Sequence, residues 1–398
     1  MLYEINQDAL AYEMEHLGVY PPSVAIMLNK GKIVPLKVLQ VRTPAANIIK
    51  QEMLAVGGEC ATPGTTIACS VPFVDILLLG TRKHYNLLLK KLKQMPYFGI
   101  PKIVPELEYY LQPVPKSTLL ADGRRLTYEQ MAVMGIINVT PDSFFAGSRR
   151  PGLDAALQQA ETMLADGAAI LDIGGESTRP GSDPVGQEEE MRRVLPVVEA
   201  IKKRFPASMI SVDTYRAAVA EAAMQCGGDI INDVTAMTGD AAMLGTVLKT
   251  KAPIVLMHMR GKPKDMQQQC EYTNVVQEVT SYLLAQAQLL RAEGVAPEKI
   301  ILDPGIGFAK KTEQNLRLMQ NLNALTANEY PVLMAASRKT TIGQVLSAGQ
   351  QPLPPEERLE GTLAVTAAAL YAGAAMVRVH DVKENLRLIR MLEAIRNV

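Results

Sequence analysis

The sequence predicts a (β/α)8 barrel of the TIM type, preceded by a small α/β N-terminal domain. The chain has 398 residues, a length that favours two domains over one. From about residue 130 onward, short apolar runs alternate with long amphipathic segments eight times, which is the number of strand–helix pairs in a closed barrel. A doubly wound open sheet is the alternative, because periodicity alone does not show whether a sheet closes.

The barrel elements follow from two periodicities. Short apolar runs bounded by glycine, proline or polar residues predict buried strands at 132–140, 168–175, 209–214, 229–235, 253–259, 299–305, 331–337 and 376–380. Apolar residues at helical spacing predict helices at 154–167, 188–205, 216–228, 240–251, 272–294, 312–325, 359–373 and 383–396. Together these elements make up a predicted barrel domain over residues 131–398.

Residues 1–115 have a different pattern and predict a separate small α/β domain. We expect strands at 20–29, 32–43 and 74–81, and helices at 44–58 and 84–97. Four prolines between residues 101 and 116 close this region and predict a linker over 116–130. No cluster of residues in this domain indicates a chemistry, so its role stays open.

The composition argues against several classes of protein. Forty-one basic and 41 acidic residues cancel, so no global field favours nucleic acid or an anionic membrane. No apolar run approaches the roughly 20 residues of a membrane-spanning helix, and the N-terminus lacks the pattern of a signal peptide. Cys60, Cys69, Cys226 and Cys270 have no CxxC spacing. They predict reduced thiols and therefore a cytoplasmic protein.

Polar side chains stand where the predicted barrel strands end. In a barrel of this type, chemistry collects at the C-terminal ends of the strands. The eight strand ends supply Asn138, Asp172, Asp213, Asn232 with Asp233, His258, Asp303, Ser337 with Lys339, and Arg378 with His380. A single residue of this kind would be a helix cap or a loop hydrogen-bonding group, but eight converging ends predict a site.

Several of these residues also fit a purely structural role. Asp213 precedes a helix and is a possible N-cap, while Asp172 or Asp303 could bind backbone N–H groups of a loop. His258 lies between methionines, as a hydrogen-bonded core histidine would. Arg378 has no such simple alternative, because an arginine on an inward-facing strand position needs an anionic partner.

The loops after the first two strands narrow the expected ligand. Residues 138–150 and 174–186 are long and contain glycine, hydroxyl and arginine residues, which suit phosphate oxygens. Asn138 and Asp142 offer the oxygen ligands that Mg²⁺ prefers. We therefore expect a substrate with two ends. Asp213, Asn232, Asp303 and Lys339 would hold a heterocycle, while Arg378, His380 and Mg²⁺ would meet a phosphate group.

Eight segments, in order, resemble those of the dihydropteroate synthase family of folate biosynthesis. They are MGIINVTPDSF, LDIGGESTRPG, ISVDT, IINDV, LMHMRGKPKDMQ, ILDPGIGF, SRKTTIG and RVHDV, and the resemblance covers about residues 120–398. It implies a transferase that condenses 6-hydroxymethyl-7,8-dihydropterin diphosphate with 4-aminobenzoate, giving 7,8-dihydropteroate and pyrophosphate. It also implies Mg²⁺ dependence, a homodimer and a target of sulfonamides.

The resemblance further assigns roles to numbered residues. It implies a pterin site made of Asp213, Asn232, Asp303 and Lys339, lined by Asp172 and Met257. It implies contact of Asn138 with Mg²⁺ or the diphosphate, and binding of the diphosphate by Arg378 and His380. It implies an aminobenzoate site bordered by Thr178, Arg179, Phe308, Ser337 and Thr340. The expected catalytic set is Asn138, Asp172, Asp213, Lys339, Arg378 and His380.

Two departures from the family pattern concern the aminobenzoate site, since Thr340 stands where serine is frequent and Ala335 where glycine is frequent. Two other functions share parts of the pattern. One is a pterin-dependent methyltransferase that acts with a corrinoid partner, and the other is a catalytically silent pterin-binding protein. The methyltransferase has no need for a diphosphate site, so Arg378 and His380 argue against it.

Overall fold

The computed structural model describes residues 5–139, 151–176, 185–261 and 266–397. The chain divides into two compact units, Met1–Val114 and Pro115–Val398. No helix among the residues described is both long and apolar enough to cross a membrane.

The larger unit contains a parallel eight-stranded sheet with the order β11-β10-β9-β8-β7-β6-β13-β12. Its strands are β6 (Ala132–Asn138), β7 (Ile170–Gly174), β8 (Met209–Asp213), β9 (Ile230–Asp233), β10 (Ile254–Met257), β11 (Ile300–Asp303), β12 (Leu333–Met334) and β13 (Met376–Val379). A parallel bridge between Leu302 and Val332 connects the two ends of this order. The predicted barrel is therefore confirmed, and the open sheet is wrong.

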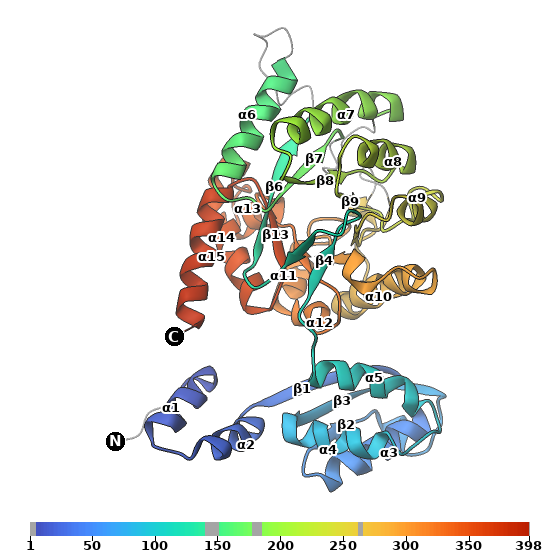
Figure 1. Cartoon of the computed structure of the whole chain (residues 1–398). Helices are drawn as coiled ribbons and strands as arrows, with labels where there is room; N and C mark the ends of the chain where they lie inside the picture. Colours follow the sequence, from blue (N-terminus) through green and yellow to red (C-terminus); the bar gives the residue numbers. More distant parts are fainter. Residues whose placement is uncertain (1–4, 140–150, 177–184, 262–265, 398) are drawn as a thin grey trace. The chain divides into compact units, whose positions relative to one another are not determined.

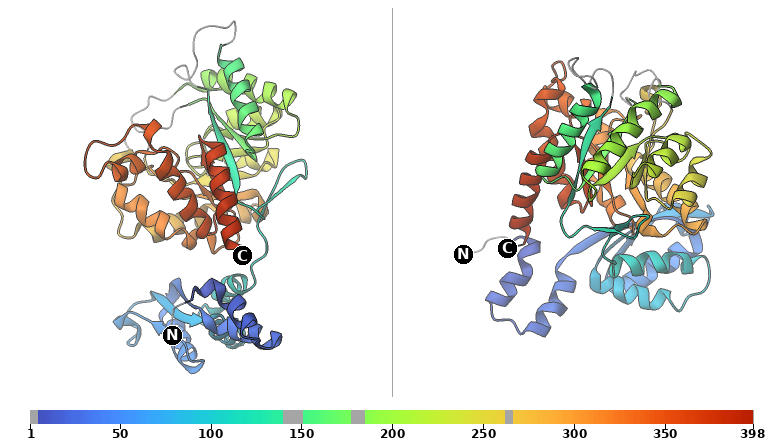
Figure 2. Two further views of the ribbon diagram at one scale, coloured as in Figure 1. Left: turned by 90° about the vertical axis from the view of Figure 1, so that its left-hand side faces the viewer. Right: turned by 45° about the horizontal axis from the view of Figure 1, so that its top comes forward.

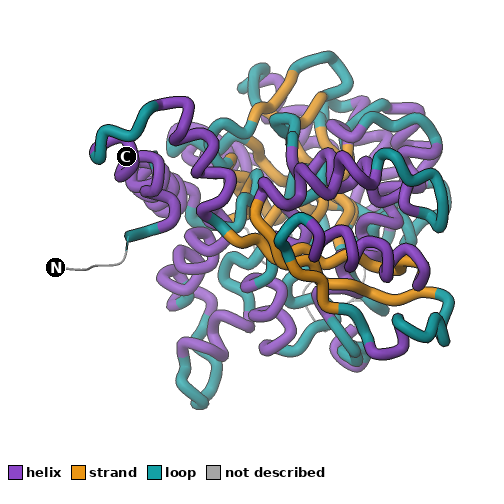
Figure 3. Tube along the Cα trace, turned by 90° about the horizontal axis from the view of Figure 1, so that it is seen from below, coloured by secondary structure: helices purple, strands orange, loops and turns teal. Residues whose placement is uncertain are grey.

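Helices lie outside these strands around the barrel (Figures 1, 2 and 3). They are α6 (Pro151–Ala165), α7 (Gln187–Arg204), α8 (Ala217–Gln225), α9 (Met243–Thr250), α10 (Val275–Ala292), α11 (Thr312–Gln320), α14 (Leu359–Tyr371) and α15 (Val382–Arg396). Two shorter helices, α12 (Asn323–Thr326) and α13 (Thr340–Leu346), flank β12. Outward strand residues such as Ile173 and Val212 form one apolar core with the buried faces of the helices.

The inward strand positions form an apolar layer beneath a polar one. The apolar layer contains Met134, Ile170, Ile230, Val255, Ile301, Leu333 and Met376. Side chains two residues apart on a strand point to the same face, so the next inward positions on β7, β9, β11 and β13 are Asp172, Asn232, Asp303 and Arg378. The polar side chains therefore lie next to a layer of packed apolar side chains.

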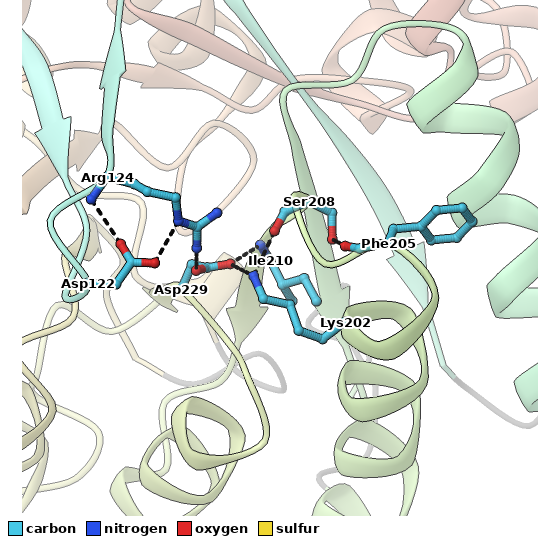
Figure 4. Close-up of polar contacts among 7 residues, drawn as sticks. All are labelled: Asp122, Arg124, Lys202, Phe205, Ser208, Ile210 and Asp229. Carbon is cyan, nitrogen blue, oxygen red and sulfur yellow. Dashed lines mark hydrogen bonds and ion pairs between the residues drawn. The ribbon is translucent and has the colours of Figure 1, made fainter.

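Residues 116–130, expected as a linker, are instead part of the barrel unit. β4 (Ser117–Leu119) and β5 (Arg125–Thr127) pair as an antiparallel hairpin, and Leu120 packs into the apolar layer. Arg124 donates hydrogen bonds to Asp122 (Nε–Oδ2, 2.6 Å) and to Asp229 before β9 (Figure 4). The prolines before residue 116 favour a linker, but the Asp-Gly pair at 122–123 is a hairpin signal.

The smaller unit is an α/β domain, as predicted. β1 (Ile33–Arg42), β3 (Phe73–Thr81) and β2 (Glu59–Ala61) form an antiparallel sheet in that order. The helices are α1 (Leu10–His16), α2 (Pro21–Gly31), α3 (Thr43–Ala55), α4 (Arg82–Leu92) and α5 (Ile100–Leu111). Tyr85 is fully buried in the core, and its hydroxyl donates to the Leu78 carbonyl oxygen (3.2 Å).

One predicted strand of this unit is wrong. Residues 21–29 belong to helix α2, which starts at Pro21, and Tyr20 is its N-cap residue. A proline in the first turn of a helix costs nothing, because its missing N–H would have no partner there, and its fixed φ suits the helix. The two adjacent prolines therefore begin this helix, although the apolar run that follows also fits a strand.

Candidate active site

Arg378 on β13 lies at the centre of a buried polar network. Its Nε donates to Asp172 Oδ2 (2.5 Å), and its Nη2 donates to Asp213 Oδ2 (2.8 Å). Asn232 Nδ2 donates to both carboxylate oxygens of Asp172, at 3.3 and 3.2 Å. The strand order places β13, β7, β8 and β9 within one arc of the barrel, so residues far apart in the chain meet. Four predicted site residues therefore form one network.

Burial and neighbouring charges set the protonation of this network. Burial raises the pKa of Asp213 to about 7; Arg378 and Lys339 act to lower it, whereas Asp172 acts to raise it. Burial lowers the pKa of Arg378, but the Asp172 and Asp213 carboxylates raise it by more, so the guanidinium stays charged. The site therefore holds a permanent cation beside a carboxylate that exchanges its proton near neutral pH.

Asp303 and Lys339 form the second charged part of the site. Asp303 is buried and accepts a hydrogen bond from the Gly305 N–H (2.7 Å). Burial raises its pKa, while the Lys339 ammonium opposes that change. Burial lowers the pKa of Lys339 to about 8, against the effect of Asp303. Lys339 Nζ donates to the Ile306 carbonyl oxygen and lies 4.3 Å from the centroid of the Phe308 ring.

Apolar side chains lie beside these charges. Met257 and Phe308 are buried in a cluster with Val234, Met259, Met266 and Ala309, and Tyr215 packs against this cluster. The members come from the carboxyl ends of β9 to β11 and the loops that follow. Apolar side chains next to a few fixed hydrogen-bonding groups are typical of sites for planar heterocycles.

Ser337 and His380, which follow the neighbouring strands β12 and β13, contact each other. The Ser337 Oγ and the His380 Nδ1 are 3.0 Å apart, and the His380 backbone N–H donates to the same Oγ (3.2 Å). Thr340 is exposed as the first residue of α13. Asn138 ends β6 and is half-buried, and its side chain makes no hydrogen bond to any residue that the structure describes.

Comparisons with known proteins identify the family to which the chain belongs. A family model described as pterin binding enzyme matches residues 134–380. The chain is also 43% identical over 288 residues to a dihydropteroate synthase of Synechocystis sp., covering 72% of this chain and 96% of that protein. The chain belongs to the dihydropteroate synthase family. The resemblance predicted from the eight segments is confirmed, and the chain is a transferase.

Two further relatives describe the extent of the match. The solved structure of Xanthomonas albilineans dihydropteroate synthase with 4-aminobenzoic acid has a TM-score of 0.66 and 38% identity, covering 72% of this chain and 100% of that one. A probable bifunctional folylpolyglutamate synthase/dihydropteroate synthase of Halobacterium salinarum is 38% identical over 385 residues, 96% of this chain and 45% of that protein. The halobacterial match therefore extends into the N-terminal unit.

Three predicted residues of the dihydropteroate synthase site lie outside the described part of the chain: Asp142, Thr178 and Arg179. Within the part that is described, no group of three or more His, Cys, Asp or Glu side chains could hold a metal ion. Asn138 is thus the one predicted metal ligand whose position the structure gives. It ends β6, and its Cα is the register partner of Gly174 at the end of β7.

Two strand-end residues have structural roles. The carboxylate of Asp233 is fully buried and accepts hydrogen bonds from the Thr235 N–H (2.8 Å) and the Met237 N–H (2.7 Å), so it shapes the loop after β9. His258 is also buried, and its Nδ1 lies 3.0 Å from Lys310 Nζ. It is the hydrogen-bonded core histidine of the alternative interpretation.

Sequence reasoning missed an ion network around Arg216, the N-cap residue of α8. Its Nη1 donates to Glu176 Oε2 (2.5 Å) and to the buried Glu190, while its Nη2 donates to the Val185 carbonyl oxygen (2.5 Å). Glu176 and Val185 come from the β7–α7 loop, and Glu190 lies in α7. The sequence signal was an arginine three residues after the strand end at Asp213, and its partners could not be predicted from spacing.

Proposed function

We propose that the chain condenses 6-hydroxymethyl-7,8-dihydropterin diphosphate with 4-aminobenzoate, releasing pyrophosphate. The observation that carries this proposal is the convergence of Asp172, Asp213, Asn232 and Arg378 opposite Asp303 and Lys339 at the strand ends. The X. albilineans relative, whose solved structure holds 4-aminobenzoic acid, supports the choice of second substrate.

The pterin ring suits the polar and apolar groups of the site. Its amino and N–H edge donates hydrogen bonds, which the Asp213 and Asp303 carboxylates would accept. Asn232 and Lys339 would supply donors to the ring nitrogens and the carbonyl oxygen. Met257 would then pack on the ring, because a flat heterocycle buries its apolar faces. Phe308 would lie between the ring and the aminobenzoate that the resemblance places beside it. A substrate without this donor edge would leave buried carboxylates unpaired, which costs roughly 1–3 kcal/mol for each group.

The leaving group is a highly charged anion, and Arg378 and His380 are the residues expected to bind it. Arg378 stays protonated between its two carboxylates, and His380 follows on the same strand face two residues later. We propose that both bind the diphosphate. Asn138 and Asp142 would hold Mg²⁺, and the amide of Asn138, which makes no hydrogen bond to the described residues, fits this role. When bound, the ion would neutralise charge on the leaving diphosphate.

The reaction exchanges one bond at the pterin methylene carbon. The C–O bond to the diphosphate breaks with both electrons leaving on pyrophosphate, and the positive charge left behind delocalises into the dihydropterin ring. The amine of 4-aminobenzoate then forms the C–N bond and loses a proton to water. A neutral arylamine is a weak nucleophile, so ionisation before capture is the expected order. Asp172 and Asp213 would stabilise the cation electrostatically.

Pyrophosphate release tests this proposal. The purified chain should release pyrophosphate from the pterin diphosphate in the presence of 4-aminobenzoate and Mg²⁺, and only slowly without the amine. Pyrophosphate release at the same rate with and without 4-aminobenzoate would indicate a hydrolase and overturn the condensation. No release, together with methyl transfer to a corrinoid, would favour the pterin-dependent methyltransferase. Pterin binding without any turnover would indicate a catalytically silent binding protein.

We also propose that the chain is a cytoplasmic homodimer. Neighbouring helices α14 and α15 expose Tyr371 (61%), Met391 (61%) and Ile395 (52%), which supports an apolar interface on this side of the barrel. Met391→Asp should then shift the molar mass measured by light scattering from dimer to monomer. Leu289→Asp, at an exposed position of α10, should leave the mass unchanged.

A further inference from the structure

Lys310, between β11 and α11, is a buried lysine that no part of the proposed mechanism uses. It is 3% exposed, and its ammonium lies within hydrogen-bonding distance of four acceptors. These are the carbonyl oxygens of Phe308 (2.8 Å), Gly305 (3.0 Å) and His258 (3.2 Å), and the His258 Nδ1 (3.0 Å). An ammonium carries three protons, so the acceptors more than satisfy it and offset its loss of hydration.

The acceptors come from two neighbouring segments of the chain. Gly305 and Phe308 belong to the turn after β11, and His258 follows β10. A Cβ at Gly305 would lie 2.0 Å from the His258 carbonyl oxygen, and Gly305 has φ +66°, so a glycine is required at this position. Without a donor between them, the carbonyl oxygens of His258 and Phe308 would lose this hydrogen bond, while the Gly305 oxygen would keep only the one from the Phe308 N–H (3.1 Å).

The same turn supplies three groups of the pterin site. The Gly305 N–H binds Asp303, the Ile306 carbonyl oxygen accepts from Lys339, and the Phe308 ring lies under the Lys339 ammonium. A shift of the turn would therefore displace both members of the Asp303–Lys339 pair. Burial lowers the pKa of Lys310 well below its usual value, and the Asp303 carboxylate opposes that change. In its charged form Lys310 in turn favours the ionised form of Asp303, in addition to Lys339 and the Gly305 N–H.

We propose that Lys310 is a positioning residue for the pterin half of the site, and that its ammonium fixes His258 as the neutral tautomer with the proton on Nε2. This inference rests on the proposed function. The Lys310 Nζ lies 3.0 Å from His258 Nδ1, and an ammonium that donates to Nδ1 leaves the single ring proton on Nε2. The ring also packs edge-on against Tyr282 (centroids 5.0 Å apart). Burial and the nearby Lys310 lower the pKa of His258 to about 2, which agrees with a neutral ring.

A binding comparison tests the positioning role. Lys310→Met should weaken binding of 6-hydroxymethylpterin, measured by calorimetry, at least tenfold, while the KM for 4-aminobenzoate changes less than threefold. The matched control is Lys311→Met, because Lys311 is the next residue and is exposed. It should bind the pterin like the unaltered protein. Lys310→Arg should not restore binding, since a planar guanidinium cannot match four acceptors grouped around one nitrogen.

The outcomes separate this inference from the proposed function. If the unaltered protein does not bind 6-hydroxymethylpterin, the proposed function fails. If it binds and Lys310→Met binds equally well, or loses both substrates to the same degree, the positioning role fails. If Lys310→Met does not fold, Lys310→Gln, which keeps two donors, takes its place under the same criteria.

The tautomer is tested on the unaltered protein. The chain has four histidines, so the imidazole nitrogens can be assigned by ¹⁵N NMR with His258→Gln as the reference. An unprotonated Nδ1 and a protonated Nε2, unchanged between pH 8 and pH 5, are expected for His258. A proton on Nδ1 would mean that Lys310 accepts and does not donate, which would overturn its assignment as the cation of this turn.

Discussion

Asp213 combines burial with charged neighbours of both signs. Arg378 pairs with it at 2.8 Å, and Asp172 shares the same guanidinium. Burial is the largest effect on its pKa and raises it to about 7. A buried carboxyl group with such a pKa loses its proton when a ligand donates hydrogen bonds to it. The free energy of that deprotonation depends on pH.

Pterin affinity should therefore depend on pH in one direction. Below pH 7 the free protein holds a proton on Asp213 that ligand binding must expel, so affinity should rise with pH, by at most about tenfold per unit, and level off above pH 7. Calorimetry with 6-hydroxymethylpterin from pH 5.5 to 8.5 measures this. Asp213→Asn should bind more weakly with a flat profile, and equal slopes in both proteins would contradict the assignment.

Asp303 allows a test with almost no change of shape. Asp303→Asn keeps the volume of the side chain but removes the charge next to Lys339, leaving a buried cation without its partner. We expect kcat/KM for pyrophosphate release to fall at least about 100-fold, or roughly 2.7 kcal/mol, while circular dichroism stays native. The same substitution at Asp122, in the hairpin turn, should leave kcat/KM within twofold. Activity near that of the unaltered chain in Asp303→Asn would remove Asp303 from the site.

At the scale of elements, Arg216 joins the start of α8 to the β7–α7 loop and to α7. One guanidinium contacts two carboxylates that are almost fully buried, Glu176 (6% exposed side chain) and Glu190 (1%). The loop between Glu176 and Val185 contains Thr178 and Arg179, the predicted aminobenzoate residues. The network therefore determines where this loop leaves and rejoins the barrel.

Arg216→Met should both destabilise the chain and impair the second substrate. Two buried carboxylates would lose their cation, which typically costs about 3 kcal/mol or more in the free energy of unfolding. The KM for 4-aminobenzoate should rise more than that for the pterin diphosphate. Arg192→Met, on the exposed side of α7, is the control and should cost less than about 1 kcal/mol.

Urea unfolding and steady-state kinetics measure the two effects of Arg216→Met. Adding Glu190→Gln to Arg216→Met should recover part of the lost stability, because a neutral amide needs no cation. If the double variant is less stable than the single one, the buried carboxylates left without a cation are not the cause of the loss.

At the scale of the whole molecule, the barrel unit begins before the barrel strands. The hairpin of β4 and β5 contributes Leu120 to the apolar layer, and Lys116 Nζ donates to the carbonyl oxygens of Thr326 (2.7 Å) and Tyr330 (3.0 Å). Arg124, Lys202 and the Ile210 N–H all contact the Asp229 carboxylate (Figure 4). These contacts lie at the end of the barrel opposite the site.

Two truncations should therefore behave differently. A chain that begins at Pro115 keeps the hairpin and should be folded and active, since the Synechocystis relative matches 72% of this chain with 96% of its own length. A chain that begins at Gln130 exposes the apolar layer and should aggregate or melt at a lower temperature. Thermal unfolding and pyrophosphate release compare the two. A folded but inactive Pro115 chain would show that the N-terminal unit contributes to catalysis.

Most of the architecture was predictable because it depends on local periodicity. The eight strand–helix pairs follow from spacings of two and of 3.6 residues, and the helical alternative at 20–29 was missed because a short apolar run fits either period. The polar residues at the strand ends could also be predicted from the sequence. In the structure they lie together: Asp172, Asp213, Asn232, Asp303, Lys339 and Arg378. Family membership also followed from the segments themselves.

The sequence by itself thus determined the fold class, the family and the positions of the polar strand ends. Only the tertiary structure decided which side chains pair, as with Asp172 and Arg378, which are 206 residues apart. It also decided the closure of the barrel at Leu302 and Val332, the burial of Lys310 and the partners of Arg216. Periodicity assigns a residue to one face of its own helix or strand. Which side chains pair depends on how elements far apart in the chain pack together, and a local pattern carries no information about that packing.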